Sequence, residues 1–368
     1  MSSNNYKLND DLEDLIEKTF KYLEKLKSNI SLDPKWEDIL NRKGFDKSIY
    51  KNIDKFRRQE KFISDYYPGT IFSNGINSNN FNNLLSNPLN EILNFFKERL
   101  PFNISMRKKI ENEIEYLIEI GAEELLKKYS LNNFSIGKPY FYSYKNININ
   151  ERSLRHFYFL NLIKKNLNKQ LSDNSLRVIL DLGGAYGFFS YLLKSEYPKT
   201  THIIVDFPQQ LVFAKYFLEN SFKNVKILDL RNINNDKINL EKTMKYDFIL
   251  LPNSKYNLID ENIIDLFCGF FSLGEMSQKT FEEYINSKIY LNSKHVFLCN
   301  RFESYPAFDK DRKGGEINIL KYNLHYFKKI SFETFPLNRF YYIRKFIFAE
   351  KKLFSSSYFS YLGKKINS

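Results

Sequence analysis

A glycine-rich turn and a following aspartate are the residues of this sequence best suited to bind a ligand. The turn, Asp181-Leu182-Gly183-Gly184-Ala185-Tyr186-Gly187, continues a short apolar run, and Asp206 ends the next such run. Glycines let a backbone approach a ligand closely. In open α/β sheets, ligands bind at the carboxyl ends of the strands. We therefore expect one site to be lined by Asp181, Gly183, Gly184, Gly187 and Asp206.

Two classes of cofactor enzyme use a turn of this kind. The dinucleotide fingerprint needs glycine at its first, third and sixth positions, and no register starting at Gly183 or Gly184 supplies all three. The turn instead resembles the acid-x-Gly-x-Gly-x-Gly pattern at the S-adenosylmethionine site of Rossmann-like methyltransferases, with Ala185 in place of the middle glycine. That cofactor carries a sulfonium and an ammonium group, so a carboxylate in the turn attracts it. A carboxylate at Asp206 can accept both ribose hydroxyls, a geometry that also serves NAD.

Three further segments narrow the resemblance. DLGGAYGFFSYLL followed by IIVDFPQQL resembles the small-molecule O-methyltransferases. The block FFSLGEM is similar to the Ser-Phe-Gly-Glu-Met block of a family of sugar O-methyltransferases associated with bacterial surface polysaccharides, and VFLCNRFE is similar to that family's strand ending in Asn-Arg. The resemblance covers roughly residues 137 to 349. It implies S-adenosylmethionine as cofactor and a hydroxyl of a sugar, in a surface polysaccharide or its precursor, as acceptor.

The block FFSLGEM differs from the plant-type enzymes at the position of the catalytic base. The plant-type small-molecule enzymes carry His-Asp-Trp in this block, and their histidine is the base; here the matching residues are Gly274, Glu275 and Met276. Glu275 is the nearest carboxylate and our candidate general base. It would need burial among its apolar neighbours to bring its pKa towards neutrality. The alternative is that Glu275 caps the helix that begins near Ser277.

Other site residues follow from the expected strand ends. We expect Asn253 beside the adenine, with Asp229 as the competing choice, and Ser272 in the cofactor pocket. Asn300 and Arg301 end a later strand at the same edge, where an arginine can clamp an anionic group of the substrate or form a structural ion pair. No His, Cys, Asp or Glu residues show a recognisable metal-ligand spacing, so we predict no metal site.

The elements that must hold these residues alternate between strands and helices. Strand, helix and strand over 177–182, 188–196 and 202–206 form a βαβ unit, which indicates a parallel sheet. Further strands are predicted at 225–228, 246–251, 264–270 and 295–300, with helices at 209–220 and 278–288. We expect 330–335 and 344–349 to pair as an antiparallel edge. The predicted fold is an α/β, Rossmann-like methyltransferase sheet, mostly parallel.

The first 150 residues indicate a different organisation. Apolar residues recur at three- and four-residue steps over 8–26 and 105–128, as in amphipathic helices, and Ser105 is a plausible N-cap. Another helix is predicted at 154–167, and 68–88 is a long loop rich in Asn, Ser, Gly and Pro. We therefore divide the chain into a helical accessory or lid region, 1–150, and a methyltransferase domain, 151–368.

Composition limits the function classes. The net charge is +13, but the basic residues occur in doublets spread along the chain, so we expect no dedicated nucleic-acid site. Two cysteines exclude a disulfide scaffold. No segment resembles a secretion signal or a membrane-spanning helix, which predicts a cytoplasmic protein with peripheral membrane contact left open.

Two alternative functions stay open. One is a methyltransferase acting on nucleic acid or on another small molecule; amino-group enzymes of the first kind carry Asp/Asn-Pro-Pro-aromatic where this chain has Phe271-Ser272-Leu273-Gly274. The other is a catalytically silent scaffold of the same fold, suggested by Ala185 and by the missing histidine. Binding of S-adenosylhomocysteine separates the enzyme from the scaffold.

Overall fold

The computed structural model describes residues 10–29, 47–58, 104–132, 135–139, 141–304, 317–338, 340–345, 348–353 and 356–366. The chain forms two compact units. The sheet unit consists of Met1–Lys51, Asn166–Pro336 and Ser356–Ser368, and the helical unit consists of Asn52–Lys165 and Leu337–Ser355.

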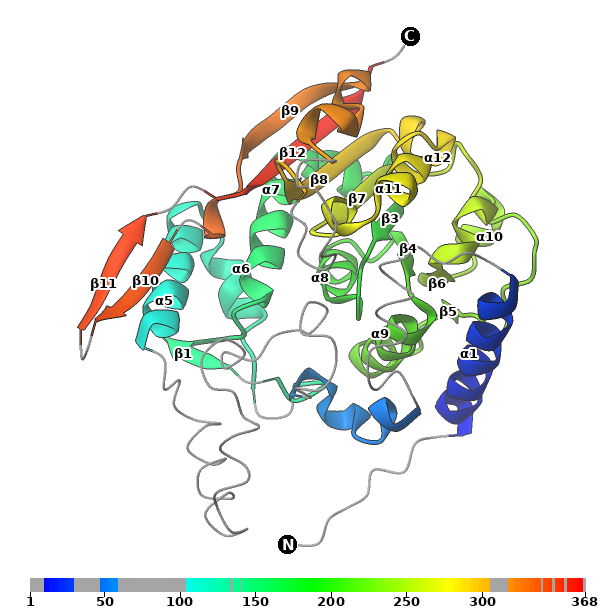
Figure 1. Ribbon diagram of the computed structural model, residues 1–368, viewed down its shortest axis with the longest axis horizontal. Coiled ribbons are helices and arrows are strands. Elements are labelled where there is room, and N and C mark those ends of the chain that lie inside the picture. Colours follow the sequence, from blue (N-terminus) through cyan, green and yellow to red (C-terminus); the bar gives the residue numbers. More distant parts are fainter. Residues whose placement is uncertain are drawn as a thin grey trace, which may run out of the picture. The chain divides into compact units, whose positions relative to one another are not determined.

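The sheet unit contains one eight-stranded sheet in the order β5-β6-β4-β3-β7-β8-β12-β9 (Figure 1). In chain order its strands are β3 (Val178–Leu182), β4 (Thr201–Asp206), β5 (Ile227–Leu228), β6 (Phe248–Pro252), β7 (Leu266–Phe270), β8 (His295–Arg301), β9 (Phe327–Thr334) and β12 (Tyr358–Lys365). The strands from β5 to β8 are parallel, and β12 runs antiparallel to both of its neighbours. This confirms the predicted α/β sheet. The order reverses at β3, which has β4 on one side and β7 on the other, and such a switch point is where ligands bind.

The two faces of the sheet carry different residues. Asp181 of β3 lies beside Ile204 of β4, so Asp181, Ile204 and Asp206 share a face because side chains alternate along a strand. The opposite face of β3 contributes Val178, Leu180 and Leu182 to an apolar core that also contains aromatic residues of α11 and α12. The two acidic residues therefore lie on the face away from this core.

Helices connect most of the parallel strands. Those of the sheet unit are α1 (Asp10–Asn29), α8 (Phe188–Glu196), α9 (Pro208–Ser221), α10 (Leu240–Thr243), α11 (Gln278–Ile285) and α12 (Lys288–Leu291), with short 3-10 helices η1 (Lys47–Tyr50), η3 (Asn253–Leu258), η4 (Leu273–Glu275), η5 (Ile319–Tyr322) and η6 (Leu324–Tyr326). The helix α8 has its predicted bounds. Helix α9 begins at Pro208 because proline at the first helical position has a suitable φ and no N–H to leave unpaired.

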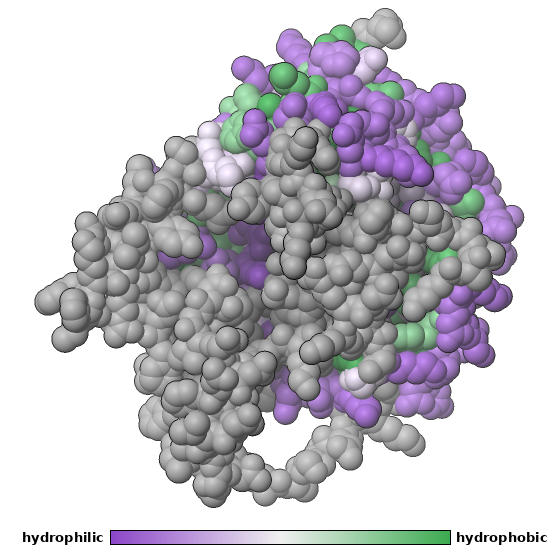
Figure 2. All heavy atoms as spheres, viewed as in Figure 1, coloured by the Kyte–Doolittle hydropathy of each residue, from purple (hydrophilic) through white to green (hydrophobic). Residues whose placement is uncertain are grey.

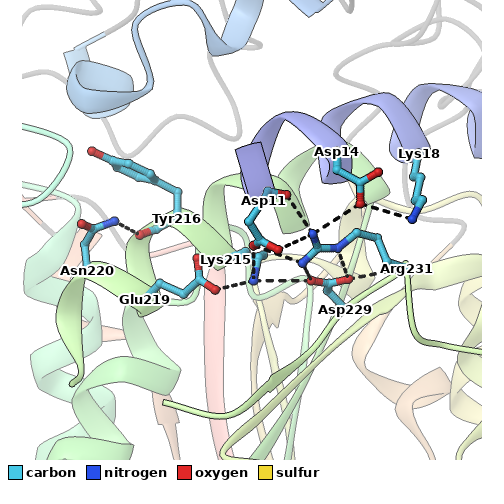
Figure 3. Close-up of polar contacts among 9 residues, drawn as sticks. All are labelled: Asp11, Asp14, Lys18, Lys215, Tyr216, Glu219, Asn220, Asp229 and Arg231. Atoms are coloured by element: carbon cyan, nitrogen blue, oxygen red, sulfur yellow. Dashed lines mark hydrogen bonds and ion pairs between the residues drawn. The ribbon is translucent and has the colours of Figure 1, made fainter. Parts of the chain in front are cut away.

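An ionic cluster fastens α1 to the sheet unit (Figure 3). The guanidinium of Arg231 donates to both carboxylate oxygens of Asp229, at 2.7 and 3.0 Å, and to Asp11 of α1, at 2.5 Å from Oδ1. Lys215 of α9 lies 3.2 Å from Asp11 and 3.5 Å from Asp229, and it also pairs with Glu219. The pKa of Asp11 is held below its ordinary value, first by its hydrogen bond from Arg231. Helix α1 thus belongs with the sheet.

The predicted antiparallel edge is wrong in its pairing. Strand β9 pairs with β12, which also pairs with β8, and the sequence prediction missed β12 altogether. The predicted strand 344–349 spans the end of one strand and the start of the next, because Arg344 of β10 pairs with Ala349 of β11 in a hairpin. The physical reason is that β12 contains glycine and two lysines and lacks the continuous apolar run of β3 or β4.

The helical unit contains η2 (Ile53–Arg58), α5 (Ile104–Glu119), α6 (Glu123–Lys128), the hairpin β1 (Tyr142–Tyr144) and β2 (Ile147–Ile149), most of α7 (Ser153–Ser172), and the hairpin β10 (Phe340–Lys345) and β11 (Phe348–Leu353). The predicted helix over 105–128 is two helices, since Gly121 takes a left-handed φ of 82° between them. Ser105 lies inside α5 and is not its N-cap.

The compact units differ from the predicted division at residue 150 in three respects. Helix α1 groups with the sheet, whereas most of α7 and the β10–β11 hairpin group with the helices. The predicted loop 68–88 lies outside the described residues. Among the helices that the structure describes, none combines the length and the apolar character required to cross a bilayer.

Candidate functional site

The glycine turn leads from β3 into α8 at the switch point. Gly183 has a φ of 76°, and a Cβ atom placed on it would lie 2.6 Å from Cβ of Ser272 in the turn after β7. A side chain is excluded there by both the backbone conformation and the close approach of that turn. Gly184 lies against Asp181, whose Cγ would be 2.8 Å from an added Cβ. Gly187 is the N-cap of α8. The glycines thus bring two strand ends together around Asp181.

Ala185 keeps the conformation that a glycine would have. Its φ is 50°, in the left-handed region, although it carries a Cβ. Its N–H donates to Oδ2 of Asp206 at 2.7 Å. The alanine that departs from the methyltransferase pattern therefore does not change the course of the turn.

We expect Ala185→Gly to raise the free energy of unfolding by about 0.5–1 kcal/mol, because glycine adopts positive φ without steric cost and the gain is partly offset by its freedom in the unfolded chain. Thermal unfolding measures it. The control is Ala214→Gly inside α9, which we expect to lose about 1 kcal/mol. A less stable Ala185→Gly protein would contradict the idea of strain at this position.

Asp206 is the last residue of β4 and is only 4% exposed. Its Oδ2 accepts from the N–H of Ala185, and its Oδ1 accepts from the N–H of Phe207 at 2.6 Å. Burial raises its pKa to about 6, and these two backbone hydrogen bonds oppose that rise. Each carboxylate oxygen has a second lone pair, so the group can still accept from a ligand.

Asp181 lies one residue before the end of β3, not at its exit. It is buried, and its Oδ2 accepts from the hydroxyl of Ser190 on α8 at 2.9 Å. Burial raises the pKa of Asp181 to about 7; the hydrogen bond from Ser190 lowers it, and the charge of Asp206 raises it further. The two carboxylates therefore interact electrostatically on one face of the sheet. A pair of buried acids with raised pKa values marks a place where a cation would be stabilised.

The sheet order places Asn253 and Asp229 at different distances from Asp206 along the sheet. Strand β6 lies directly beside β4, with Pro252 next to Asp206 in the register, so Asn253 follows at the same edge. Strand β5 lies beyond β6, and Asp229 after it is bound in the ionic cluster with Arg231 and Lys215. Asn253 is therefore the better placed of the two.

Asn300 holds the turn that follows β7. This residue of β8 is fully buried, its Nδ2 donates to the carbonyl of Gly269 at 2.8 Å, and its Oδ1 accepts from the N–H groups of Ser272 and Gly274. The hydroxyl of Ser272 donates to the carbonyl of Leu182 at 2.9 Å. The amide of Asn300 thus positions the turn through three hydrogen bonds to the backbone, and its contact with substrate stays a prediction.

Glu275 and Arg301 lie on either side of this turn. Glu275 ends η4 and is partly exposed, so it lacks the full burial that would bring its pKa towards neutrality. The cap of α11 is Ser277, whose hydroxyl accepts from the N–H of Thr280, which contradicts the alternative capping role of Glu275. The guanidinium of Arg301 lies 5.0 Å from the ring centroid of Tyr358, in a cation–π contact.

The sequence analysis missed three residues of this region. The hydroxyl of Ser190 on α8 donates a hydrogen bond to Asp181. The signal for this contact in the sequence was the position of Ser190, nine residues after Asp181. Phe271 has a φ of 54°, for which the sequence gives no signal. Gln209, three residues after Asp206, is fully buried, and its carboxamide has no hydrogen-bond partner among the described residues.

The described residues hold no group of three His, Cys, Asp or Glu side chains arranged to bind a metal ion.

Comparisons with known proteins give low similarity. No protein-family model matches the chain, and no curated protein matches it. Among solved structures, the mitomycin 7-O-methyltransferase MmcR is 9% identical with a TM-score of 0.28 over 58% of this chain and 57% of its own. An O-methyltransferase family protein of Burkholderia thailandensis is 10% identical with a TM-score of 0.31, over 58% and 59%. An O-methyltransferase family 2 protein of Planctomyces limnophilus, in complex with apigenin, is 14% identical with a TM-score of 0.28, over 59% and 62%. The chain thus spans somewhat more than half of each.

Proposed function

We propose that this protein is an S-adenosylmethionine-dependent O-methyltransferase that methylates a hydroxyl of a sugar in a surface polysaccharide or its precursor. The observation that carries the proposal is the pair Asp181 and Asp206, two buried carboxylates with raised pKa values on one face of the sheet at its switch point. Such a pair is costly without a cation, and this cofactor is cationic at the sulfonium and at the amino group. The sugar acceptor rests on the resemblance of the FFSLGEM and CNR segments.

The residues present fit this cofactor. Gly183 and Gly184 leave no room for side chains and expose backbone next to Asp181. Asp206 keeps lone pairs for two ribose hydroxyls, and the orphan carboxamide of Gln209 is a buried group of the kind that a ligand satisfies. Asp181 would hold the amino-acid end, Asp206 the ribose, Asn253 the adenine, and Ser272 would line the pocket.

When bound, the cofactor supplies an electrophilic methyl group for in-line displacement by an acceptor oxygen. The protein must then orient the acceptor and remove one proton. Glu275 accepts that proton at its carboxylate, and Arg301 binds an anionic group of the acceptor. Asn300 fixes the turn that carries Glu275, through its hydrogen bonds to Ser272 and Gly274. The partial exposure of Glu275 means that a bound acceptor must complete its burial.

Titration with S-adenosylhomocysteine tests the cofactor assignment. We expect a dissociation constant in the micromolar range and a rise in the unfolding temperature. No binding would overturn the enzyme assignment and favour the scaffold. Transfer of labelled methyl groups to the host's nucleotide-linked and lipid-linked sugars tests the acceptor; labelling of another small molecule or of nucleic acid in place of sugars would overturn that part alone.

Glu275→Gln should lower kcat about 100-fold, because the amide cannot take the proton of the acceptor hydroxyl. Binding of S-adenosylhomocysteine should be unchanged, which separates a catalytic defect from a folding defect. The matched control is Glu283→Gln on the exposed side of α11. Turnover within a few-fold of the parent would show that Glu275 is not the base.

A further inference from the structure

Exposed apolar side chains gather at the β9 end of the sheet unit. Leu320 of η5 is 88% exposed, and four other large apolar residues of this region are also exposed: Tyr326, Ile330, Phe332 and Ile366. Figure 2 shows hydrophobic residues among hydrophilic ones at the top of the view, where β9 and β12 lie in Figure 1. Elsewhere in the described chain, the exposed large apolar residues are Leu240 and Met244, at α10. Clustering of this kind marks an interaction surface.

The contacts bring these residues together. The N–H of Ile366 donates to the carbonyl of Tyr326 at 3.1 Å, so the end of β12 lies beside the start of β9. Phe332 and Tyr322 both pack against the ring of Phe359, with centroids 6.4 and 5.1 Å away. Leu320, two residues before Tyr322, therefore lies near the same face of the sheet as Phe332.

Lysines accompany the apolar side chains. Lys328 and Lys329 are exposed on β9, and Lys364 of β12 is exposed and lies opposite Lys328 in the strand register. None of these three lysines has an ion pair with a described residue. The acidic residue of β9 is Glu333, and it lies at the opposite end of the strand from Lys328 and Lys329. We call the exposed residues along this edge, Leu320, Tyr326, Ile330, Phe332 and Ile366 with Lys328, Lys329 and Lys364, the β9 patch. The patch wraps around the edge of the sheet, because side chains alternate along a strand and Lys328 and Lys364 therefore lie on the face opposite Phe332.

Features of β9 disfavour a second copy of the chain as its occupant. Consecutive residues of β12, Leu362 and Gly363, pair with Ser331 and Lys329 of β9. Ile330 therefore has no partner in the register and forms a bulge. A bulge and neighbouring lysines are the devices by which edge strands avoid pairing with another strand. In a symmetric contact centred on the two lysines, Lys328 of one copy would also face Lys329 of the other, and like charges repel.

We propose that the β9 patch binds the surface of an anionic lipid bilayer. Aliphatic and aromatic side chains enter the boundary between headgroups and acyl chains, while lysines interact with anionic headgroups. The surplus of positive charge over the whole chain, +13, acts in the same direction. This binding is independent of the proposed methyl transfer and is measured without cofactor or acceptor.

Vesicle co-sedimentation of the full chain tests the proposal. We expect binding to phosphatidylcholine vesicles containing about one third phosphatidylglycerol, and at least tenfold weaker binding to phosphatidylcholine alone. The double variant Lys328→Gln/Lys329→Gln should bind about 25-fold more weakly, because each lysine near an anionic surface contributes about fivefold to the affinity. The double variant Ile330→Ser/Phe332→Ser should bind at least tenfold more weakly, because the apolar side chains that the bilayer would bury are gone. Binding should fall at about 1 M salt, where the Debye length is about 3 Å.

Two control pairs make the same chemical changes elsewhere. Leu240→Ser/Met244→Ser and Lys223→Gln/Lys226→Gln should bind vesicles as the parent does, and circular dichroism checks that all variants fold. Equal binding to neutral and anionic vesicles, or equal losses in patch and control variants, would overturn the proposal. A parent dimer that becomes a monomer on Ile330→Ser/Phe332→Ser, with no vesicle binding, would overturn it in favour of a second copy.

Discussion

Asp206→Asn is expected to weaken binding of S-adenosylhomocysteine about 100-fold, since two hydrogen bonds from ribose hydroxyls to a charged acceptor are each worth about 1.5 kcal/mol or more. The same change should stabilise the ligand-free protein at pH 8 by about 1–2 kcal/mol. Removal of the buried negative charge stabilises the folded protein. This gain is larger than the cost of losing one of the two hydrogen bonds from backbone N–H groups, because the amide of asparagine has only one acceptor oxygen. Loss of affinity with a gain in stability distinguishes a binding residue from a structural one.

The pH dependence follows from the raised pKa of Asp206, about 6. A carboxyl whose folded-state pKa lies above the unfolded value of about 3.9 binds more protons in the folded protein between those values. The contribution of Asp206 to the free energy of unfolding therefore falls as pH rises from about 4 to about 6 and levels off above. The advantage of Asp206→Asn should disappear below about pH 4. Binding of the cationic donor should strengthen as pH rises through 6 to 7, where both Asp206 and Asp181 become charged.

Thermal unfolding and calorimetry between pH 4 and 8 measure both effects. Asp236→Asn, at an exposed position after β5, is the matched control and should change neither. Unchanged affinity in Asp206→Asn would remove this residue from the donor site. A variant less stable than the parent at pH 8 would show that the hydrogen bonds to Ala185 and Phe207 outweigh the buried charge.

Arg231→Ala is expected to release α1 from the sheet unit. The guanidinium is mostly buried and makes a bidentate pair with Asp229, which is itself buried, as well as bonds to Asp11. Removal of one partner of a buried pair costs about 3 kcal/mol because the other charge is left uncompensated. Lys215, 3.5 Å from Asp229, retains part of the attraction.

Hydrogen exchange along α1 is the direct measurement. Its amides should exchange about 100-fold faster in Arg231→Ala, while those of β3 and β4 change little. Lys245→Ala, which breaks the exposed pair with Glu241, is the control and should leave the exchange of the α1 amides unchanged. Equal protection of α1 in the parent and in Arg231→Ala would show that apolar packing alone holds this helix.

The part of the fold around the candidate site could be predicted because its signals are local. The runs at β3 and β4 are apolar on both faces, the glycine turn joins β3 to α8, and Pro208 marks the start of α9. The parallel sheet follows from these neighbours in sequence. The position of β12 could not be predicted, since its place between β8 and β9 depends on partners far away in the chain.

Side-chain roles were predictable only where position on a strand decides them. Asp206 ends β4 as expected, and Asn253, preferred over Asp229 from the sequence, follows the strand directly beside β4. Asn300 was placed correctly in the chain, but its amide serves three backbone groups, which no sequence pattern reveals. The same holds for the left-handed backbone at Ala185 and Phe271.

The place of β12 has a consequence for biosynthesis. This strand is translated after every other strand of its sheet, yet it lies between two of them and supplies the pairing of β9. While the ribosome is still making residues 358–365, the parallel half from β5 to β8 can already assemble, but β8 keeps an open edge and β9 waits unpaired. Nascent chains stalled before this strand should therefore depend on chaperones that cover such edges.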